Sequence, residues 1–210
     1  MPTPSPAPAP PTGPRTARPG AFLREFLRDP LHTASLLPSS RPLAAAASGP
    51  VPGTGEPVVV ELGPGTGAFT GAIAERLGGR GHHLAVELNP RLAGLLERAH
   101  PGLDVAVADA LALPALLAER GLGRADVVVS GLPWAAHPAT GRTLSAVLAG
   151  SLHPHGVLTQ FGYTCTRSLP PARRLRRQLA AAFADVTCGP TVWANLPPAF
   201  VLTARLPRHP

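Results

Sequence analysis

The segment 58–67, Val-Val-Val-Glu-Leu-Gly-Pro-Gly-Thr-Gly, limits what this chain can fold into more than any other stretch. Three consecutive valines predict a strand that is buried on both faces. The Gly-x-Gly-x-Gly that follows predicts a tight turn, because a Cβ there would block the backbone turn or the close approach of a ligand. A helix is predicted from about 68 to 77, with its positive N-terminal end facing whatever binds over the turn. Such a turn can also be purely structural, so residues further along the chain must decide its meaning.

Strands and helices alternate after this turn. Further strands are predicted at 83–87, 104–108, 126–130 and 156–161. Helices are predicted at 90–99, 111–120, 139–149 and 171–183. Two last strands, 186–195 and 200–206, are predicted to form an antiparallel pair. This order predicts an α/β fold with a mostly parallel sheet, an antiparallel last strand, and helices on both faces.

The N-terminal part of the chain differs in composition. Residues 1–20 are rich in Pro, Ala and Thr and are predicted to be disordered. Residues 21–49 are predicted to hold a short amphipathic helix at 21–29, stopped by Pro30, and a helix capped by Ser39 or Ser40. Residues 50–210 then form the main domain.

Composition excludes several kinds of chemistry. All 19 basic residues are arginine, so the chain has no lysine for a Walker phosphate loop, a Schiff base or a Tyr-Lys dehydrogenase pair. The net charge of +7 is compatible with an anionic partner. Cys165 and Cys188 lie far apart, which predicts reduced thiols in a cytoplasmic protein and no zinc site. No apolar run approaches the ~20 residues of a membrane span, and no secretory signal is expected.

Three acids fall at the ends of predicted strands. Glu61 ends the first strand; Glu87 ends the second, 20 residues after Gly67; Asp109 follows the third. In an open parallel sheet these ends share one edge, where ligands bind. A carboxylate at Glu87 can accept both hydroxyls of a ribose, and Asp109 can reach an adenine amino group. A nicotinamide site would share the turn and the ribose acid, but it would not explain the third acid followed by Ser130-Gly131-Leu132-Pro133-Trp134.

This set of stations resembles the class I S-adenosylmethionine-dependent methyltransferases, whose Rossmann-like fold has a seven-stranded sheet. Further segments resemble the bacterial phospholipid N-methyltransferases of the peripheral-membrane type. They are 32–41, 61–67, 86–90, 130–133, 160–163 and 195–199. This resemblance implies methyl transfer to the amine of phosphatidylethanolamine and its methylated products. It also implies that the helix near Phe22–Arg28 lies on the lipid surface.

Candidate site residues follow from this resemblance. S-adenosylmethionine is expected to be bound by Glu61, Gly63, Pro64, Gly65, Thr66, Gly67, Glu87, Leu88, Asp109, Ala110 and Ser130. The amine is expected to be aligned by Ser130, Gly131, Leu132, Pro133, Trp134 and Tyr163. Carbonyls of the 131–132 stretch can accept amine N–H bonds, and Trp134 can face the growing positive charge. No metal is expected.

The alternatives are an rRNA adenine N6-methyltransferase, a small-molecule methyltransferase of secondary metabolism, and a non-catalytic cofactor-binding remnant. Glycine at 131 disfavours adenine, because nucleobase amino methyltransferases usually hold the amine there with an Asn, Asp or Ser side chain. The chain also ends just after the last predicted strand, which counts against an RNA-gripping domain, so nucleic acid is not the expected partner. An anionic membrane surface is the expected one, met through 21–29 and Arg173–Arg177, with the protein peripheral on the cytoplasmic face.

Overall fold

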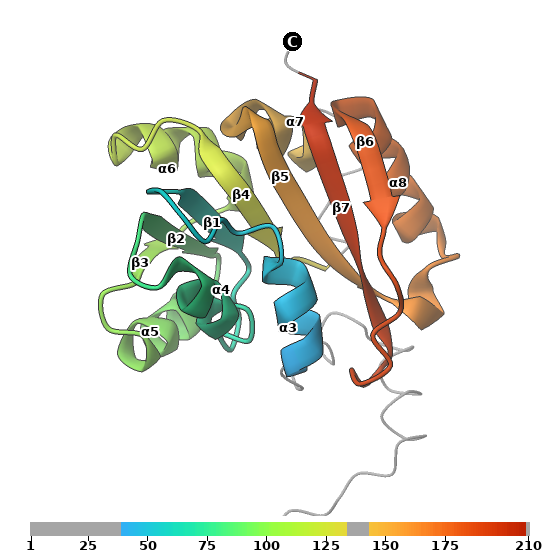
Figure 1. Ribbon diagram of the computed structural model, residues 1–210, viewed down its shortest axis with the longest axis horizontal. Helices are drawn as coiled ribbons and strands as arrows, with labels where there is room; N and C mark the ends of the chain where they lie inside the picture. Colours follow the sequence, from blue (N-terminus) through green and yellow to red (C-terminus); the bar gives the residue numbers. More distant parts are fainter. Residues whose placement is uncertain (1–38, 134–142, 209–210) are drawn as a thin grey trace, which may run out of the picture.

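The computed structural model describes residues 39–133 and 143–208. These residues form one seven-stranded sheet with the order β3-β2-β1-β4-β5-β7-β6 (Figure 1). The strands are β1 (Val58–Leu62), β2 (His82–Glu87), β3 (Asp104–Val107), β4 (Ala125–Ser130), β5 (Leu152–Tyr163), β6 (Phe183–Cys188) and β7 (Ala199–Pro207). The α-helices are α3 (Arg41–Ser48), α4 (Thr70–Leu77), α5 (Pro90–Ala99), α6 (Leu113–Glu119), α7 (Leu144–Ser151) and α8 (Pro170–Ala182). Two short 3₁₀ helices are η1 (Ala110–Ala112) and η3 (Thr164–Thr166).

The sheet is parallel from β3 to β5, and β7 runs antiparallel to both of its neighbours. This arrangement confirms the predicted Rossmann-like class. The carboxyl ends of the parallel strands lie at the lower edge of Figure 1, and the loop that joins β6 to β7 reaches the same edge.

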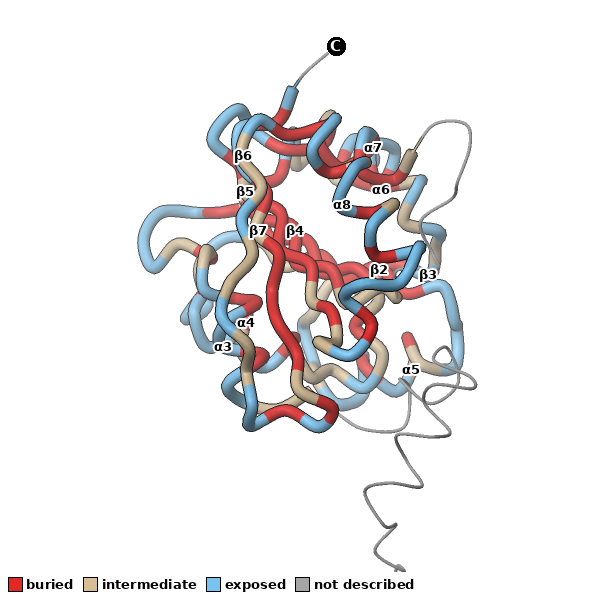
Figure 2. The backbone as a smooth tube through the Cα atoms, turned by 90° about the vertical axis from the view of Figure 1, so that its right-hand side faces the viewer, coloured by how far each residue is buried: buried red, intermediate tan, exposed pale blue. Residues whose placement is uncertain are grey.

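Helices cover both faces of the sheet. One core contains Leu43 of α3 and Ile73 of α4. The other contains apolar residues of α6, α7 and α8. The three valines of β1 explain the two cores, because Val59 points into the first and Val60 into the second. Figure 2 shows the buried strands as a red layer between the helices.

Helix α3 is tied to the rest of the fold at both ends. At its start, Ser40 N donates a hydrogen bond to Asn195 Oδ1, and Ser40 Oγ caps the helix at Leu43 N. Near its end, the carbonyl of Ala47 accepts from Thr159 Oγ1 on β5 at 2.8 Å. The predicted cap at Ser40 is thus present, and the helix packs against the domain as part of its fold.

Two strand boundaries differ from the sequence-based expectation. Strand β5 begins at Leu152, not at 156, so His153 and His155 lie in the strand and not in a turn before it. A register shift between Ala125 and Val127 accommodates this extra stretch. Strand β6 spans Phe183–Cys188, not 186–195. Gly189 N still donates to Val201 O, but Pro190 has no N–H to continue the regular pairing, and beyond it an isolated antiparallel bridge joins Val192 to Ala199.

Some expectations fall outside the described residues. They are the tail 1–20, the amphipathic helix 21–29 and the first residues of the helix expected at 139–149, whose described part is α7. In the part of the chain that is described, no helix combines the length and apolar character required to cross a bilayer.

Candidate functional site

The candidate site lies where the strand order reverses, between β1 and β4. Ligands of such sheets bind outside the carboxyl ends of the strands at this point. Leu62 pairs with Ser130 across the two strands, and Gly131 N donates to Leu62 O at 2.8 Å. The glycine turn after β1 and the 130–133 segment after β4, called the acceptor loop below, therefore leave the sheet side by side.

The glycine turn is open on one side and packed on the other. Gly63, Gly65 and Gly67 all have positive φ, at +63°, +55° and +82°. A Cβ on Gly65 would meet nothing within 4 Å, whereas one on Gly63 would lie 2.7 Å from Leu132 Cδ2. The backbone at Gly65 is thus free to be approached by a ligand, while Gly63 packs against the acceptor loop.

Glu87 closes the turn from the neighbouring strand. Its Oε2 accepts from Gly65 N at 3.1 Å and its Oε1 accepts from Asn89 N at 2.9 Å. A carboxylate can accept about four hydrogen bonds, so capacity remains for hydroxyls of a ligand placed over Gly65. The side chain is held rigidly because the residue is buried and both oxygens are bound to backbone.

Glu61 lies behind the turn, not at its open side. The residue is fully buried, and its Oε2 accepts from Thr70 Oγ1 at the start of α4 at 2.7 Å. His83 Nε2 lies 3.2 Å from the same oxygen, close enough for an ion pair when the ring is protonated, but its N–H is not aimed as in a hydrogen bond. Glu61 Oε1 has no hydrogen-bond partner among the described residues. Glu61 therefore joins β1, β2 and α4 beneath the turn.

The remaining residues expected at the cofactor site are spread along the same edge. Ala108 N donates to Glu87 O, so the start of the 108–110 stretch lies beside Glu87. Asp109 is exposed and its Oδ1 accepts from Leu111 N, which begins η1. Leu88 is 69% exposed and Leu111 43% exposed, so two apolar side chains flank this end of the sheet. Sequence reasoning named Leu88 and missed Leu111. Within the turn, Pro64 is buried and Thr66 is exposed.

The acceptor loop is fixed by backbone and by one side chain. A Cβ on Gly131 would lie 2.7 Å from Gly63 O, so no side chain fits at this position. Gln160 Nε2 donates to Leu132 O at 2.9 Å and to Phe161 O at 3.0 Å. Ser130 is buried, and its Oγ accepts from Leu132 N at 3.4 Å. Because Gln160 uses one lone pair of the Leu132 carbonyl, that carbonyl keeps one for a substrate N–H.

Tyr163 stands at the end of β5, two strands from the turn. Its ring packs edge-on against Phe161, with centroids 5.4 Å apart. Burial, with a smaller contribution from Cys165, raises the pKa of the phenol above its usual range. The group is therefore a neutral phenol at physiological pH. The expected amine contact Trp134 lies outside the described residues.

Three contacts were not foreseen from the sequence as parts of the site. They are the Gln160 bond to the acceptor loop, the Thr70–Glu61–His83 cluster, and the Asn195 bond to Ser40. Each joins residues from different elements, so no local pattern signals it. Elsewhere, a groove of about 340 Å³ lies at the opposite edge beside His153 and shares no residue with the turn. The described residues contain no group of three or more His, Cys, Asp or Glu side chains that could hold a metal ion.

The residues fit S-adenosylmethionine. The open backbone at Gly65 faces a carboxylate with spare acceptor capacity, an exposed carboxylate follows the next strand, and exposed leucines follow both strands. Together with the seven-stranded order β3-β2-β1-β4-β5-β7-β6 and its antiparallel β7, this site indicates a class I S-adenosylmethionine-dependent methyltransferase, an enzyme with S-adenosylmethionine as cofactor.

Comparison with known proteins supports this class. The fold is similar to that of a solved carbon methyltransferase, CurJ, with a TM-score of 0.60 and 17% identity over 85% of this chain; the chain spans 58% of that structure's length. It is also similar to human methyltransferase-like protein 13 in complex with SAH, with a TM-score of 0.58 and 18% identity over 80% of each chain. No model of a known protein family matches the chain.

A closer relative has been curated. The chain is 36% identical over 143 residues to the ornithine lipid N-methyltransferase of Singulisphaera acidiphila, across 66% of this chain and 74% of that enzyme. The chain therefore belongs to the family of that lipid N-methyltransferase, within the class I S-adenosylmethionine-dependent methyltransferases.

Proposed function

We propose that this enzyme transfers methyl groups to the amine of a membrane lipid at the bilayer surface. The first candidate acceptor is phosphatidylethanolamine with its methylated derivatives, because six segments of the chain resemble the bacterial phospholipid N-methyltransferases. The kinship with a lipid N-methyltransferase supports an acceptor of this chemical class.

The observation that carries the proposal is the close contact of Gly131 with Gly63. Because a Cβ at 131 would lie 2.7 Å from Gly63 O, the first residue after β4's end can offer only its backbone to an acceptor. Nucleobase amino methyltransferases usually hold their amine with a side chain at this position. A flexible alkyl amine does not need a side chain at this position, since backbone carbonyls can accept hydrogen bonds from its N–H groups and orient its lone pair. The contact thus favours an aliphatic amine over adenine.

The chemistry required of the protein is alignment and desolvation. When bound, S-adenosylmethionine supplies a methyl group already activated on a sulfonium, and transfer is an in-line displacement. We assign the carbonyls of Gly131 and Leu132 to the amine N–H groups, with Gln160 and Pro133 holding the loop in place. The amine must be neutral when it attacks, so the rate should rise with pH as more of the amine loses its proton.

Tyr163 is assigned to headgroup binding rather than to proton removal. Its pKa is raised by burial, so the phenol keeps its proton at neutral pH and acts as a hydrogen-bonding group. Trp134 is assigned to the growing positive charge on nitrogen, a contact worth about 0.5–2 kcal/mol.

A second candidate acceptor is an ornithine lipid. The observation that favours it is the name of the relative at 36% identity, which acts on that lipid. Both lipids present an aliphatic amine at a membrane surface, so the same acceptor loop serves either. The two candidates differ in the group beside the amine, and only an assay with both can rank them.

We further propose that the enzyme acts as a peripheral protein on the cytoplasmic face of the membrane. Support comes from α8, which buries Ala172, Leu175, Leu179 and Ala182 and directs arginines away from the core. Arg173, Arg176 and Arg177 are exposed. Each arginine near an anionic surface contributes on the order of 1 kcal/mol. The expected helix at 21–29 would add an apolar contact.

The test is methyl transfer from labelled S-adenosylmethionine with four acceptors in parallel. They are vesicles with phosphatidylethanolamine, vesicles with an ornithine lipid, vesicles with anionic lipid alone, and naked ribosomal RNA. Label in the lipid phase only with an amine lipid supports the proposal, and the better acceptor ranks the two candidates. Label in RNA, or in no lipid despite intact cofactor binding, contradicts it; the second result would redirect the search to small amines.

A further inference from the structure

Three segments meet at the carboxyl edge of the sheet, next to the candidate acceptor site. They are 39–49 with α3, 163–177 with the start of α8, and the β6–β7 loop at 189–198. Ser40 N donates to Asn195 Oδ1, and Thr164 N donates to Pro198 O, both at 2.8 Å. The start of α3 and the segment after β5 are therefore both joined to the β6–β7 loop, and the three segments, called the basic rim below, reach the same edge of the sheet (Figure 1).

The β6–β7 loop exposes large apolar side chains on this rim. Trp193 is 77% exposed and Leu196 59% exposed, and Leu169 on the adjoining segment is 43% exposed. The loop is held in shape from within, because Val192 N donates to Ala199 O at 2.6 Å and Asn195 Nδ2 donates to Pro197 O at 2.8 Å. Asn195 is buried between the two exposed side chains. A fixed loop that leaves a tryptophan and a leucine in water indicates a partner surface.

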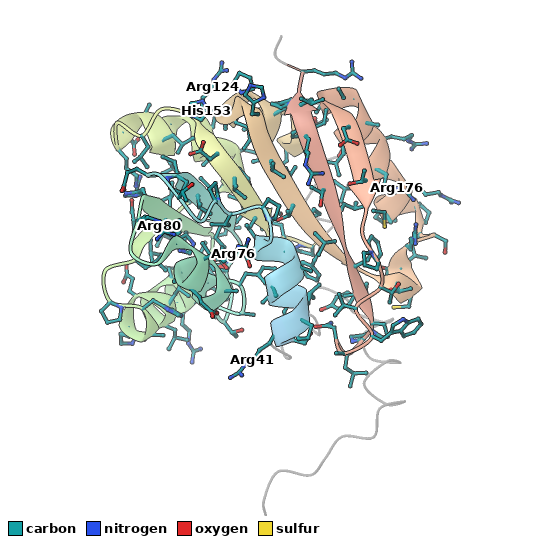
Figure 3. The ribbon with its side chains drawn as sticks, in the orientation of Figure 1. Arg41, Arg76, Arg80, Arg124, His153 and Arg176 are labelled. Atoms are coloured by element: carbon teal, nitrogen blue, oxygen red, sulfur yellow. The ribbon has the colours of Figure 1, made fainter. Side chains whose placement is uncertain are left out.

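The charges of the rim have a single sign. Its three segments contain no aspartate and no glutamate. They carry six arginines: Arg41, Arg167, Arg173, Arg174, Arg176 and Arg177. Figure 3 shows Arg41 at the lower end of α3 and Arg176 directed outward from α8, whereas Arg124 and His153 lie at the opposite edge. An exposed tryptophan on a loop that is hydrogen-bonded to two arginine-bearing segments without acids is complementary to the headgroup region of an anionic bilayer.

We propose that the basic rim docks on an anionic lipid bilayer, with Trp193 and Leu196 inserted among the headgroups. This inference rests on the proposed lipid substrate and adds the surface that meets the membrane. Tyr163 pairs with Ala199, the first residue after the loop, so a docked loop brings the end of β5 to the lipid surface. The acceptor site then opens toward the bilayer, and a lipid amine reaches it without the lipid leaving the membrane.

The test compares a double substitution in the β6–β7 loop with a single leucine substitution near the opposite edge of the sheet. Leu196→Ser combined with Trp193→Ser removes the apolar contact, and Leu206→Ser is the matched control, since Leu206 is 53% exposed near the far end of β7. Binding is measured by sedimentation with vesicles of phosphatidylethanolamine and phosphatidylglycerol. The double variant should bind at least about tenfold more weakly, and Leu206→Ser should bind as the unchanged protein does. Cofactor affinity should be equal in all three.

A second measurement uses the loop without altering it. Trp134 and Trp193 are the chain's two tryptophans, so Trp134→Phe leaves Trp193 as the sole reporter. Its emission should shift to shorter wavelength on addition of anionic vesicles and be quenched by lipids brominated on the acyl chain.

Several results would overturn the proposal. One is equal vesicle binding by the double variant; another is Trp193 emission that vesicles leave unchanged, as when another part of this chain or a second copy already covers the loop. Binding of ribosomal RNA in place of vesicles would assign the rim to nucleic acid.

If the double variant still methylates vesicle lipid at the unchanged rate, the proposed role of the rim is wrong while the lipid function stands. If the unchanged protein binds vesicles through Trp193 but methylates no lipid, the function fails while the rim stands.

Discussion

Asn195 and Ser40 are 155 residues apart in the chain, and Asn195 Oδ1 accepts a hydrogen bond from Ser40 N at 2.8 Å. The same asparagine donates from Nδ2 to Pro197 O, so its side-chain amide is used at both ends. The residue is 5% exposed. This one side chain therefore fixes the start of α3 and the shape of the β6–β7 loop together.

Asn195→Ala should lower the free energy of unfolding by about 1–3 kcal/mol. The substitution leaves Ser40 N and Pro197 O without their partner, and unsatisfied buried polar groups carry a cost of that size. Urea denaturation measures it. Ser40→Ala is the matched control, because it removes the cap to Leu43 N but keeps the bond to Asn195. If Ser40→Ala lowers the free energy of unfolding more than Asn195→Ala does, the buried amide of Asn195 is not the main contact that stabilises the start of α3.

Glu87→Ala should weaken S-adenosylmethionine binding by at least about tenfold. It removes the acceptor offered to ligand hydroxyls and releases Gly65 N and Asn89 N from the carboxylate. Isothermal titration calorimetry gives the affinity. Glu119→Ala, an exposed glutamate at the end of α6, should leave it unchanged. Equal affinity in the two variants would remove Glu87 from the cofactor site.

Gln160→Met should lower the rate of methyl transfer by about tenfold while cofactor affinity stays within about twofold. Methionine keeps the volume of the side chain but loses both hydrogen bonds that Nε2 donates, so the acceptor loop is held less firmly. Comparing kcat with the calorimetric affinity separates the two effects. A loss confined to cofactor binding would show that Gln160 supports the glycine turn and not the acceptor.

Because of Asp104, we expect the free energy of unfolding to fall in acid. Burial favours a raised pKa for this carboxyl, but hydrogen bonds from Arg120 and His82 outweigh it and hold the pKa below the usual value. A carboxyl with a depressed pKa in the folded state stabilises it above the unfolded pKa of about 3.9, and this contribution is lost as pH falls through the folded pKa.

Asp104→Asn should therefore destabilise the protein by about 1–2 kcal/mol at neutral pH and flatten the fall in stability below about pH 4. Urea denaturation across that range provides the curve. Asp185→Asn is the control, because Asp185 lies 3.9 Å from Arg205 and both side chains are more than two-fifths exposed, so little change is expected. An unaltered slope for Asp104→Asn would contradict the assignment.

Local patterns in the sequence predicted much of the fold. The valines of β1, the positive-φ glycines and the acid at the end of β2 each signal their own structure, because strand burial and turn geometry are decided by neighbouring residues. The order of elements then predicted the parallel sheet and the antiparallel β7. The strand predicted at 186–195 was wrong in its bounds, because the length of β6 depends on its continuous pairing with β7, which is interrupted after Gly189 and returns only as the Val192–Ala199 bridge.

The site was predicted less completely. The positions of Glu87 and the acceptor loop could be predicted, because both lie at the carboxyl ends of parallel strands, which meet at one edge of the sheet. The role of Gln160 could not be predicted, since nothing near this residue in the chain shows that its amide reaches Leu132. Glu61 stays a prediction for the cofactor site, and the contacts of its buried carboxylate with Thr70 and His83 were not foreseen. The steric reason for Gly131 also required coordinates, because Gly63 O is the atom that excludes a side chain.

If the acceptor nitrogen belongs to a membrane lipid, intact-lipid mass spectrometry will detect the methylated product. The purified enzyme is incubated with S-adenosylmethionine and vesicles that contain phosphatidylethanolamine, an ornithine lipid and phosphatidylglycerol. We expect that an amine lipid gains the mass of one or more methyl groups, that fragmentation places them on the headgroup nitrogen, and that phosphatidylglycerol stays unchanged. Unmodified amine lipids beside an enzyme that binds S-adenosylmethionine normally would contradict this expectation.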